Sequence, residues 1–326
     1  MRQRLEQIWY GKGAGGRLLR PVGALYAGIA TLRRRLYQTG VLRSHGVGVP
    51  VVVVGNINVG GTGKTPLTLW LARRLAERGR RPGIVSRGYG GQPGPVPLRV
   101  EEDADPSRVG DEALLFARHA GCPVFVHPDR VAAARAAVEA GADVILSDDG
   151  LQHYRFARDF EIAVVDMERG LGNGRCLPAG PLREPPSRLE TVDQIFSQGL
   201  SGVDQAIGFT LQPAAAVNLA DGTRRELADF AGQAVYGIAG IGNPARFFRT
   251  LREAGIKVIE HPLADHAEPS PQELNPPDTL PVFMTEKDAV KCRTRAGRRH
   301  WYVPVSVEMD EAAAAAFLER LDEHLH

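Results

Sequence analysis

Residues 51–75 place a β-branched segment, a glycine-rich loop and an amphipathic segment in direct succession. Four consecutive valines predict a buried strand, and leucines spaced four residues apart predict one face of a helix. The loop GNINVGGTGKT joins them and ends in Gly63, Lys64 and Thr65. A P-loop requires this order, because its backbone N–H groups, its helix N-terminus and its lysine together bind phosphate groups. The chain is therefore expected to form an α/β fold that binds a nucleoside triphosphate.

The residues of this loop have separate predicted roles. Lys64 is expected to contact the β- and γ-phosphates, and Thr65 is expected to bind Mg²⁺ through its hydroxyl. Asn58 stands where the general pattern has its first glycine, and asparagine tolerates a positive φ, so the departure is compatible with a P-loop. A tight turn without a ligand is the alternative, but it does not account for Lys64 and Thr65 at the start of a helix. The predicted nucleotide-binding residues are Asn58, Val59, Gly60, Gly61, Thr62, Gly63, Lys64 and Thr65.

Strands and helices alternate beyond the loop, which predicts a mainly parallel sheet with helices on both faces. Strands are expected at residues 81–86, 123–127, 143–147 and 161–166, and helices at residues 110–120 and 129–140. The alternation restarts after residue 233, with strands at 234–239, 256–260, 282–285 and 301–305 and helices at 244–254 and 310–324. The predicted fold class is α/β: a P-loop NTPase-type, mainly parallel sheet with a second, smaller α/β domain.

These patterns divide the chain into four regions. Residues 1–45 form a basic amphipathic segment, residues 46–205 the P-loop core, residues 206–232 a connecting ribbon, and residues 233–326 the smaller C-terminal α/β domain. Within the ribbon, strands near residues 206–211 and 214–218 are expected to be antiparallel. The cleft between the two domains is the expected substrate site, because ligands commonly bind between domains.

Acidic residues at the ends of two predicted elements are candidates for the chemistry. Asp148 and Asp149 end a hydrophobic strand, where P-loop proteins place a carboxylate for Mg²⁺. A turn or a helix cap is the alternative for this pair. Asp111 begins a predicted helix, where a capping role and a role as general base for a hydroxyl proton are both open.

Two loops combine charged side chains with a flexible backbone. Arg87 and Tyr89 lie in RGYGG, and Arg183 and Glu184 lie in LPAGPLRE. Both loops suit the binding of a phosphate or a sugar, although ordinary loops are the alternative. In the second domain, His266 follows an aspartate in a loop, and a structural and a functional role are both open. The segment TEKDAVK at residues 285–291 follows a predicted strand and is rich in charged residues, and its pattern does not indicate a particular role.

The first 45 residues carry a net charge of +8, against −6 for the remainder. Between the arginines, the apolar stretch at residues 21–32 is too short to span a bilayer, which takes about 20 apolar residues. Neighbouring tyrosines and a tryptophan favour a helix that lies in an anionic membrane interface. A helix packed on its own domain and a nucleic-acid-binding arm are the alternatives, and the apolar residues argue against the nucleic acid.

Composition is that of an ordinary soluble globular protein, with 43% hydrophobic and 24% charged residues. The three cysteines lie far apart, and none forms a Cys-x-x-Cys pair. A disulfide framework and a zinc site are therefore not expected.

Taken in order, these motifs resemble those of the tetraacyldisaccharide 4′-kinase family, the lipid A kinases. The matching stretches are GNINVGGTGKTP, SRGYGG, VGDEALL, SDDGLQH, LPAGPLRE, ADH and TEKDAVK, and with the basic N-terminal segment they cover nearly the whole chain. The resemblance implies ATP- and Mg²⁺-dependent transfer of the γ-phosphoryl group to the 4′-hydroxyl of tetraacyldisaccharide 1-phosphate, giving lipid IVA. It also implies a peripheral enzyme on the cytoplasmic face of the bacterial inner membrane.

The same resemblance implies a role for each matched residue. Asp111 is the implied catalytic carboxylate, His266 orients and polarises it, and Lys64 assists the transfer. Asp148 and Asp149 correspond to the acidic pair around the metal. Where the family often has two consecutive histidines, this chain has one. The implied substrate-binding residues are Arg87, Tyr89, Gln152, His153, Arg183 and Glu184.

Three other functions use a loop of this kind: a GTPase or ATPase switch, a nucleotide-gated membrane scaffold, and a kinase for a small soluble metabolite. A GTPase requires an Asn/Thr-Lys-x-Asp string, and the nearest string, TEKD at residues 285–288, has the wrong spacing. A scaffold would not need Asp111, and a small-metabolite kinase would not need the basic segment. The expected partners are the acylated disaccharide lipid and an anionic membrane surface, with no nucleic acid and no obligate protein partner.

Overall fold

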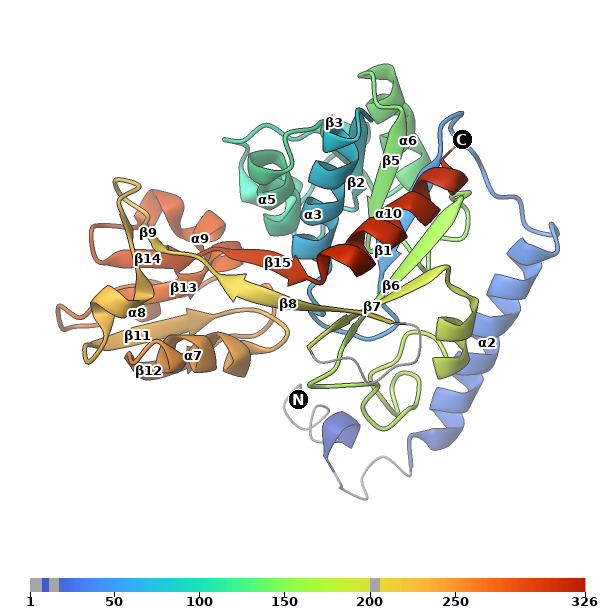
Figure 1. Ribbon diagram of the computed structural model, residues 1–326. Coiled ribbons are helices and arrows are strands. Elements are labelled where there is room, and N and C mark those ends of the chain that lie inside the picture. Colours follow the sequence, from blue (N-terminus) through green and yellow to red (C-terminus); the bar gives the residue numbers. More distant parts are fainter. Residues whose placement is uncertain (1–7, 12–17, 200–205, 326) are drawn as a thin grey trace.

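Two β-sheets lie next to each other in the computed structural model, which describes residues 8–11, 18–199 and 206–325 (Figure 1). The larger sheet has nine strands and the smaller sheet has six. Helix α2 (Arg20–Gln38) flanks the larger sheet at the end of the molecule opposite the smaller sheet (Figure 1). The predicted α/β fold with a second, smaller α/β unit is confirmed.

The larger sheet carries the P-loop at its centre. Its strand order is β15-β8-β7-β6-β1-β5-β2-β4-β3, and all neighbours are parallel except at the two edges, where β15 and β3 are antiparallel to their partners. The strands are β1 (Val51–Gly55), β2 (Pro82–Ser86), β3 (Leu98–Arg99), β4 (Val124–Val126), β5 (Val144–Asp148), β6 (Phe160–Asp166), β7 (Gln194–Gln198), β8 (Ile207–Pro213) and β15 (Val305–Met309).

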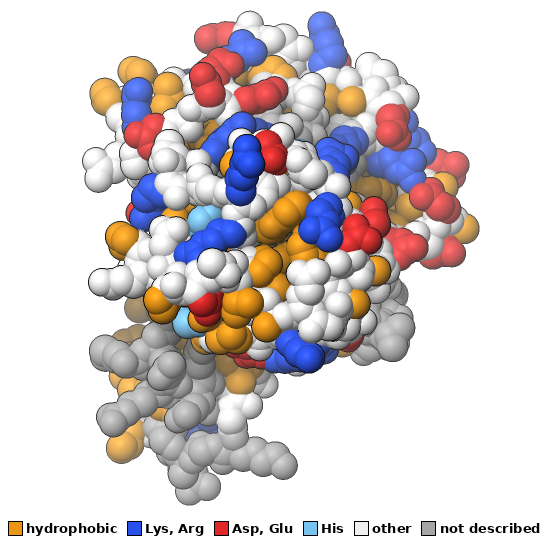
Figure 2. All heavy atoms as spheres, turned by 90° about the vertical axis from the view of Figure 1, so that its left-hand side faces the viewer, with side chains coloured by type: hydrophobic (Ala, Val, Ile, Leu, Met, Phe, Trp, Pro, Cys, Tyr) orange, Lys and Arg blue, Asp and Glu red, His pale blue; other side chains and the backbone are white. Residues whose placement is uncertain are grey.

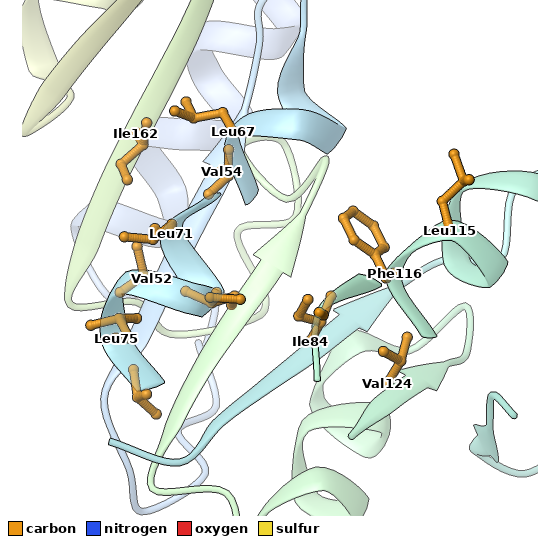
Figure 3. Close-up of a cluster of buried hydrophobic side chains, with 14 of the residues drawn as sticks. Val52, Val54, Leu67, Leu71, Leu75, Ile84, Leu115, Phe116, Val124 and Ile162 are labelled. Atoms are coloured by element: carbon orange, nitrogen blue, oxygen red, sulfur yellow. The ribbon is translucent and has the colours of Figure 1, made fainter. Parts of the chain in front are cut away.

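The valines of β1 divide the core into two layers, because successive side chains of a strand point to opposite faces. Val52 and Val54 pack with helix α3 (Lys64–Glu77), whose Leu71 is fully buried, as Figure 3 shows. Full burial of such a side chain contributes about 1.5–3 kcal/mol to folding. The other two β1 valines pack in a separate cluster against α6 (Arg130–Glu139). Both faces of the sheet are thus covered, as the hydrophobic run predicts.

Shorter elements connect the strands of the larger sheet. Helices α4 (Pro106–Val109) and α5 (Asp111–His119) lie between β3 and β4, and the 3₁₀ helix η2 (Pro186–Thr191) precedes β7. Glycine is required between α4 and α5, because Gly110 has φ 86° and a Cβ there would lie 2.4 Å from the carbonyl oxygen of Tyr89. This close approach fixes the loop that carries Tyr89 against the start of α5.

The smaller sheet has the order β10-β9-β14-β13-β11-β12, with a parallel half from β14 to β12. Phe248, Phe283 and Trp301 are among the side chains of its main core cluster. On the face shown in Figure 2, basic and acidic side chains are interspersed with hydrophobic ones. The elements are β9 (Ala216–Asn218), β10 (Arg224–Arg225), η3 (Leu227–Phe230), β11 (Ala234–Ala239), α7 (Pro244–Glu253), β12 (Lys257–Pro262), α8 (Pro271–Leu274), β13 (Val282–Thr285), α9 (Glu286–Cys292), η4 (Arg293–Arg295) and β14 (His300–Val303).

Two expectations for the region between the sheets and for the C-terminus are wrong. The strands at 207–213 and 216–218 do not pair with each other: β8 joins the larger sheet, where it pairs with β7 and β15, and β9 joins the smaller one. Helix α10 (Glu311–His324), expected to complete the second domain, instead buries Phe317 and Leu321 in the core of the larger sheet. The chain therefore returns to the first unit through β15.

Candidate active site

The P-loop runs from the end of β1 to the start of α3. Gly63 has φ 89°, the left-handed conformation that glycine adopts without strain, and directly precedes Lys64. Asn56 is fully buried, and its side-chain amide donates to the carbonyl of Gly60 and to the hydroxyl of Thr62, both at 3.2 Å. These two hydrogen bonds stabilise the conformation of the loop.

Asn58 does not have the positive φ expected at the place of the first glycine of the P-loop pattern. It is not among the residues with positive φ, and its side-chain amide donates to the carbonyl oxygen of Gly170 at 2.8 Å. The neighbouring Val59 N–H donates to Pro181 at 2.8 Å. The first part of the loop therefore pairs with the LPAGPLRE segment, and the explanation that Asn58 tolerates a positive φ is wrong.

Lys64, Asp149 and Arg183 lie together at the mouth of the loop. The Lys64 Nζ is 3.5 Å from Asp149 Oδ1, and Arg183 Nη1 donates to both carboxylate oxygens, at 2.9 and 2.8 Å. Burial raises the pKa of Asp149, but the charges of Lys64 and Arg183 outweigh it and hold this pKa well below its ordinary value. Asp149 is therefore ionised throughout the physiological range.

Asp148 is a buried carboxylate with unmet hydrogen-bonding capacity. Its side chain is 1% exposed, and neither of its oxygens has a hydrogen-bond partner among the described residues. Burial, with a contribution from Glu112, raises the pKa of Asp148 to about 7. Asp148 pairs with Val54 in the parallel register of β1 and β5. It therefore lies at the carboxyl end of these strands, where the P-loop begins.

This acidic edge fits a divalent cation bound mainly by phosphate oxygens. The described residues contain no group of three or more His, Cys, Asp or Glu side chains that converge on one point. Mg²⁺ in nucleotide sites uses one or two carboxylates together with phosphates and water, so a larger protein cage is not required. The two free oxygens of Asp148, the ionised Asp149 and the hydroxyl of Thr65 in the first turn of α3 are the donors of the kind that Mg²⁺ prefers.

Asp111, at the start of α5, meets His266, in the loop after β12 of the smaller sheet, although the two are 155 positions apart in the chain. The His266 Nδ1 is 3.1 Å from Asp111 Oδ2 and 3.3 Å from Oδ1. Burial raises the pKa of Asp111, but the hydrogen bond from His266 and the charges of Lys287 and Lys291 outweigh it, so this pKa lies below its ordinary value. Asp111 is therefore an ionised, oriented carboxylate.

Backbone strain coincides with this site. In the described part of the chain, Asp149 with φ 46° and His266 with φ 63° are the non-glycine residues with positive φ. Such conformations cost about 1–3 kcal/mol each and persist where the surrounding structure imposes them. The ring of Tyr89 lies 4.6 Å from that of His266, whereas the side chain of Arg87 is exposed. Of these two residues of the RGYGG loop, Tyr89 thus lies next to the carboxylate–histidine pair.

The remaining predicted site residues differ in their access to a ligand. Gln152 lies next to Arg183 and donates to Glu184 Oε2 at 2.9 Å. Glu184 is 3% exposed and bonds to Tyr154 and Gln152, so it positions Gln152 and does not extend to the site surface. Burial and the nearby guanidinium of Arg130 lower the pKa of His153 to about 4, so its imidazole is neutral.

Several groups that shape the site have no local sequence signal. Arg130 donates to the carbonyl of Asp148 at 3.2 Å from α6, and Arg188 is a buried partner of the Glu184 network. Lys287 and Lys291 of α9 lie beside Asp111 and His266. The segment TEKDAVK, through its dense charge and its resemblance to the family, points to the two lysines, but it does not say what they contact.

A glycine-rich loop before Lys64 at the centre of a mainly parallel sheet, together with a carboxylate that is held by a histidine of the smaller unit, is the arrangement expected of a P-loop phosphotransferase. Comparison with protein families identifies the particular family. Residues 16–324 match the family model described as LpxK, tetraacyldisaccharide-1-P 4′-kinase. The chain belongs to this family, and the resemblance read from the motifs is confirmed.

Individual relatives agree with the family. The chain is 53% identical over 307 residues to the tetraacyldisaccharide 4′-kinase of Alkalilimnicola ehrlichii, covering 94% of this chain and 92% of that one. It is 48% identical over 326 residues to the Pseudomonas aeruginosa protein of the same name, covering 99% and 98%. Among solved structures, "apo" form LpxK from Aquifex aeolicus in complex with ATP has a TM-score of 0.78 and 26% identity, covering 95% and 99%.

Proposed function

We propose that this chain transfers the γ-phosphoryl group of ATP to the 4′-hydroxyl of tetraacyldisaccharide 1-phosphate, with Asp111 as the general base. The observation that carries this assignment is the contact of Asp111 with His266 across the two sheets, 3.1 Å long. In this role Asp111 accepts the proton of the 4′-hydroxyl as the oxygen attacks the γ-phosphorus, and His266 holds the carboxylate in place. The bond from the γ-phosphorus to the β,γ-bridging oxygen breaks, and ADP leaves.

The low pKa of Asp111 is compatible with this role. Phosphoryl transfer passes through a loose transition state in most analyses, so catalysis depends mainly on positioning and charge stabilisation. A strongly basic group is then not needed, whereas an ionised and oriented one is. Lys64 supplies positive charge at the phosphates, and the buried position of Asp111 keeps competing water away from the proton acceptor.

Thr65, Asp148 and Asp149 are the residues that would hold Mg²⁺. When bound, the ion neutralises the phosphate charge and orients the transferring group. Lys64 and the glycine-rich segment 58–63 would bind the phosphates of ATP. The groups left to contact the sugar and its phosphate are Arg183, Gln152, Arg87 and Tyr89. His153 follows Gln152 in the chain and contributes a neutral imidazole.

The affinity for Mg²⁺ is expected to rise with pH through about 7, where the raised pKa of Asp148 lies. The sign follows because a raised pKa leaves the carboxyl protonated below that pH, and a protonated carboxyl is a poor metal ligand. Isothermal titration of the ATP-loaded protein with Mg²⁺ between pH 6 and 8 measures this, and Asp148→Asn is expected to remove the dependence. An affinity independent of pH in the wild type would exclude Asp148 as a ligand.

One assay tests the reaction itself. Purified protein is incubated with ATP, Mg²⁺ and detergent-dispersed tetraacyldisaccharide 1-phosphate, and the lipid product is identified by mass and by the position of the new phosphate. A 4′-phosphorylated lipid is expected. Release of phosphate to water alone would favour an ATPase switch, and phosphorylation of a small sugar in preference to the lipid would favour a soluble-metabolite kinase.

We further propose that α2 attaches the protein to the cytoplasmic face of the inner membrane as a peripheral protein. Within the described residues, no helix is long and apolar enough to cross a bilayer. Gly23 is the buried residue of α2, where a Cβ would lie 2.7 Å from that of Ala179. Most of the helix is exposed, and a stripe of large apolar side chains follows one face at three- and four-residue spacing: Val22, Leu25, Ile29 and Leu32. With arginines beside it, this stripe suits an anionic interface.

Replacing two residues of this stripe is expected to weaken membrane binding. Leu25→Gln with Ile29→Gln should lower partitioning to phosphatidylglycerol-containing vesicles by about tenfold or more, because each buried side chain contributes about 1.5–3 kcal/mol. Vesicle sedimentation measures the change. The control is Ile259→Gln, which replaces a similarly apolar side chain, 41% exposed, in the smaller sheet. Equal binding by all three proteins would mean that α2 is only a packed part of the fold.

A further inference from the structure

Lys287 lies between the two halves of the candidate site. Its Nζ is 2.9 Å from Glu112 Oε1, 3.3 Å from His266 Nε2 and 3.9 Å from Asp265 Oδ1. The side chain is 15% exposed, so these contacts are largely shielded from water. Burial lowers the pKa of Lys287, but the carboxylates of Glu112, Asp111 and Asp265 outweigh it and hold this pKa above its ordinary value. Lys287 is therefore an ammonium ion.

Hydrogen-bond chemistry determines how the imidazole of His266 must be protonated between these neighbours. An ammonium group has only donors, so the His266 nitrogen that faces Lys287 must accept. That nitrogen is Nε2, and the other, Nδ1, faces the ionised carboxylate of Asp111, which can only accept. The neutral imidazole with its proton on Nδ1 satisfies both partners. The other neutral tautomer satisfies neither, and an imidazolium would direct an N–H at the ammonium.

We propose that Lys287 is a positioning residue for the reaction: its ammonium donates to His266 Nε2 and thereby holds this histidine in the neutral tautomer that donates from Nδ1 to Asp111. The inference deepens the proposed function and rests on it for its catalytic meaning. Asp111 then keeps one directed N–H donor and retains its negative charge for the sugar hydroxyl.

The surrounding groups support this arrangement. Asp265 Oδ1 is 3.8 Å from His266 Nε2, beyond hydrogen-bond distance, so the lysine is the nearer partner. Lys291 lies 3.9 Å from Asp111 and adds positive charge without contact to the imidazole in the described structure. Tyr89 packs against the ring. Among the residues that the structure describes, no carboxylate lies closer to Nε2 than the ammonium of Lys287 does.

The backbone fixes Lys287 and His266 relative to each other. Asp288, the next residue of α9, is fully buried and accepts from the N–H of Gly240 at 2.9 Å. The N–H of His266 in turn donates to the carbonyl of Gly240 at 3.0 Å. The start of α9 and the strained loop of His266 are thus anchored at one residue, and Glu112 adds a link from Lys287 to the first sheet.

The tautomer of His266 tests the inference directly. In ¹⁵N-labelled full-length protein, the ring nitrogens of His266 are assigned by comparison with His266→Asn, and their chemical shifts distinguish a protonated from an unprotonated nitrogen. The wild type is expected to show a protonated Nδ1 and an unprotonated Nε2 at pH 7.5. In Lys287→Met, which keeps most of the unbranched side chain but removes the donor, a mixture of tautomers or a doubly protonated ring is expected.

Catalysis supplies a second readout. Lys287→Met is expected to lower kcat by about 10- to 100-fold, by analogy with the loss when the outer partner of a metal-binding histidine is removed, with KM for ATP unchanged. Lys287→Gln retains an N–H donor and should recover part of the loss. The matched control is Glu286→Gln, which removes the charge from the neighbouring contact of α9 with His119, 2.6 Å long; in the described structure Glu286 touches neither Asp111 nor His266. It should leave the tautomer and kcat at wild-type values.

Two results would overturn the proposal. One is a wild-type His266 protonated at Nε2, and the other is a His266 tautomer in Lys287→Met identical to that of the wild type, in a protein with unchanged thermal unfolding. Failure of the proposed function is distinguishable, because it would appear as an absence of lipid phosphorylation by the wild type. The ring-nitrogen measurement needs no substrate and decides the role of Lys287 in either case.

Discussion

Asp111→Asn is expected to lower kcat for phosphorylation of the lipid by about 10²- to 10⁴-fold, the usual contribution of a positioned general base. Asparagine has nearly the same shape but cannot accept the proton of the 4′-hydroxyl. ATP affinity should stay close to that of the wild type, because Lys64 and the P-loop backbone make no contact with Asp111 in the described structure. Steady-state kinetics with the lipid, together with direct ATP-binding measurements, separate the two effects.

A carboxylate from the same segment provides the control for this variant. Asp105 caps α4 by accepting from the N–H of Ser107 at 2.8 Å, and it lies outside the site. Asp105→Asn should therefore affect stability slightly and kcat not at all. If Asp111→Asn retained more than a third of the wild-type kcat, Asp111 would not be the base.

The pH dependence of the wild type follows from the lowered pKa of Asp111. Because this pKa lies below the ordinary value of 3.8, the carboxylate is already ionised above that pH. A lowered pKa means that the activity carried by Asp111 is present at neutral pH and lost only as the pH falls through the lowered pKa. An acidic limb between pH 6 and 8 must then come from another group, and Asp148, with its pKa of about 7, is the candidate.

Local sequence patterns were sufficient for the central part of the fold. The valines of β1 and the leucines of α3 lie within 25 residues of each other, and their burial follows from periodicity alone. Asp148 could be placed beside the P-loop because carboxyl ends of adjacent parallel strands meet at one edge of the sheet.

Contacts between distant segments could not be predicted in this way. β8 pairs with β15 about 100 residues later, and neither strand carries a pattern that selects this partner over β9. α10 has an apolar face that fits either sheet, and only the return of the chain through β15 decides between them. The pairing of Asp111 with His266 followed from the family resemblance and not from any spacing in the sequence.

Burial also limits the role that a predicted site residue can have. Glu184 lies in a motif that suits sugar or phosphate binding, yet its carboxylate is enclosed by Tyr154, Gln152 and Arg188. A sequence pattern identifies the loop but not which of its side chains faces the ligand. The neighbouring Arg183, which reaches Asp149, is the residue of this loop that faces the site.

Arg188→Met is expected to lower the free energy of unfolding by about 3–5 kcal/mol, the cost of removing one partner from a buried ion-pair network. Arg188 is 2% exposed, and its guanidinium lies 2.6 Å from Glu161 Oε1 and 3.7 Å from Glu184 Oε2. It also donates to the hydroxyl of Tyr154 at 3.2 Å. Methionine fills much of the same volume but leaves the two carboxylates with fewer donors in a site where water cannot replace them. Chemical denaturation measures the loss.

An ion pair at the surface provides the control, because it shows how much stability is lost when an exposed arginine is replaced. Arg155 is 50% exposed and bonds to Asp129 at 2.8 Å, so Arg155→Met should cost only about 0–1 kcal/mol. If the two variants lost equal stability, burial of the Arg188 network would contribute nothing beyond a surface ion pair.

Adding Glu184→Gln to Arg188→Met should restore part of the loss of stability. The added substitution removes the charge that the missing guanidinium leaves uncompensated, while the amide oxygen still accepts from Tyr154. The kcat of this double variant should stay below that of the wild type. The reason is that the carboxylate of Glu184, which accepts from Gln152 and positions it, is no longer present.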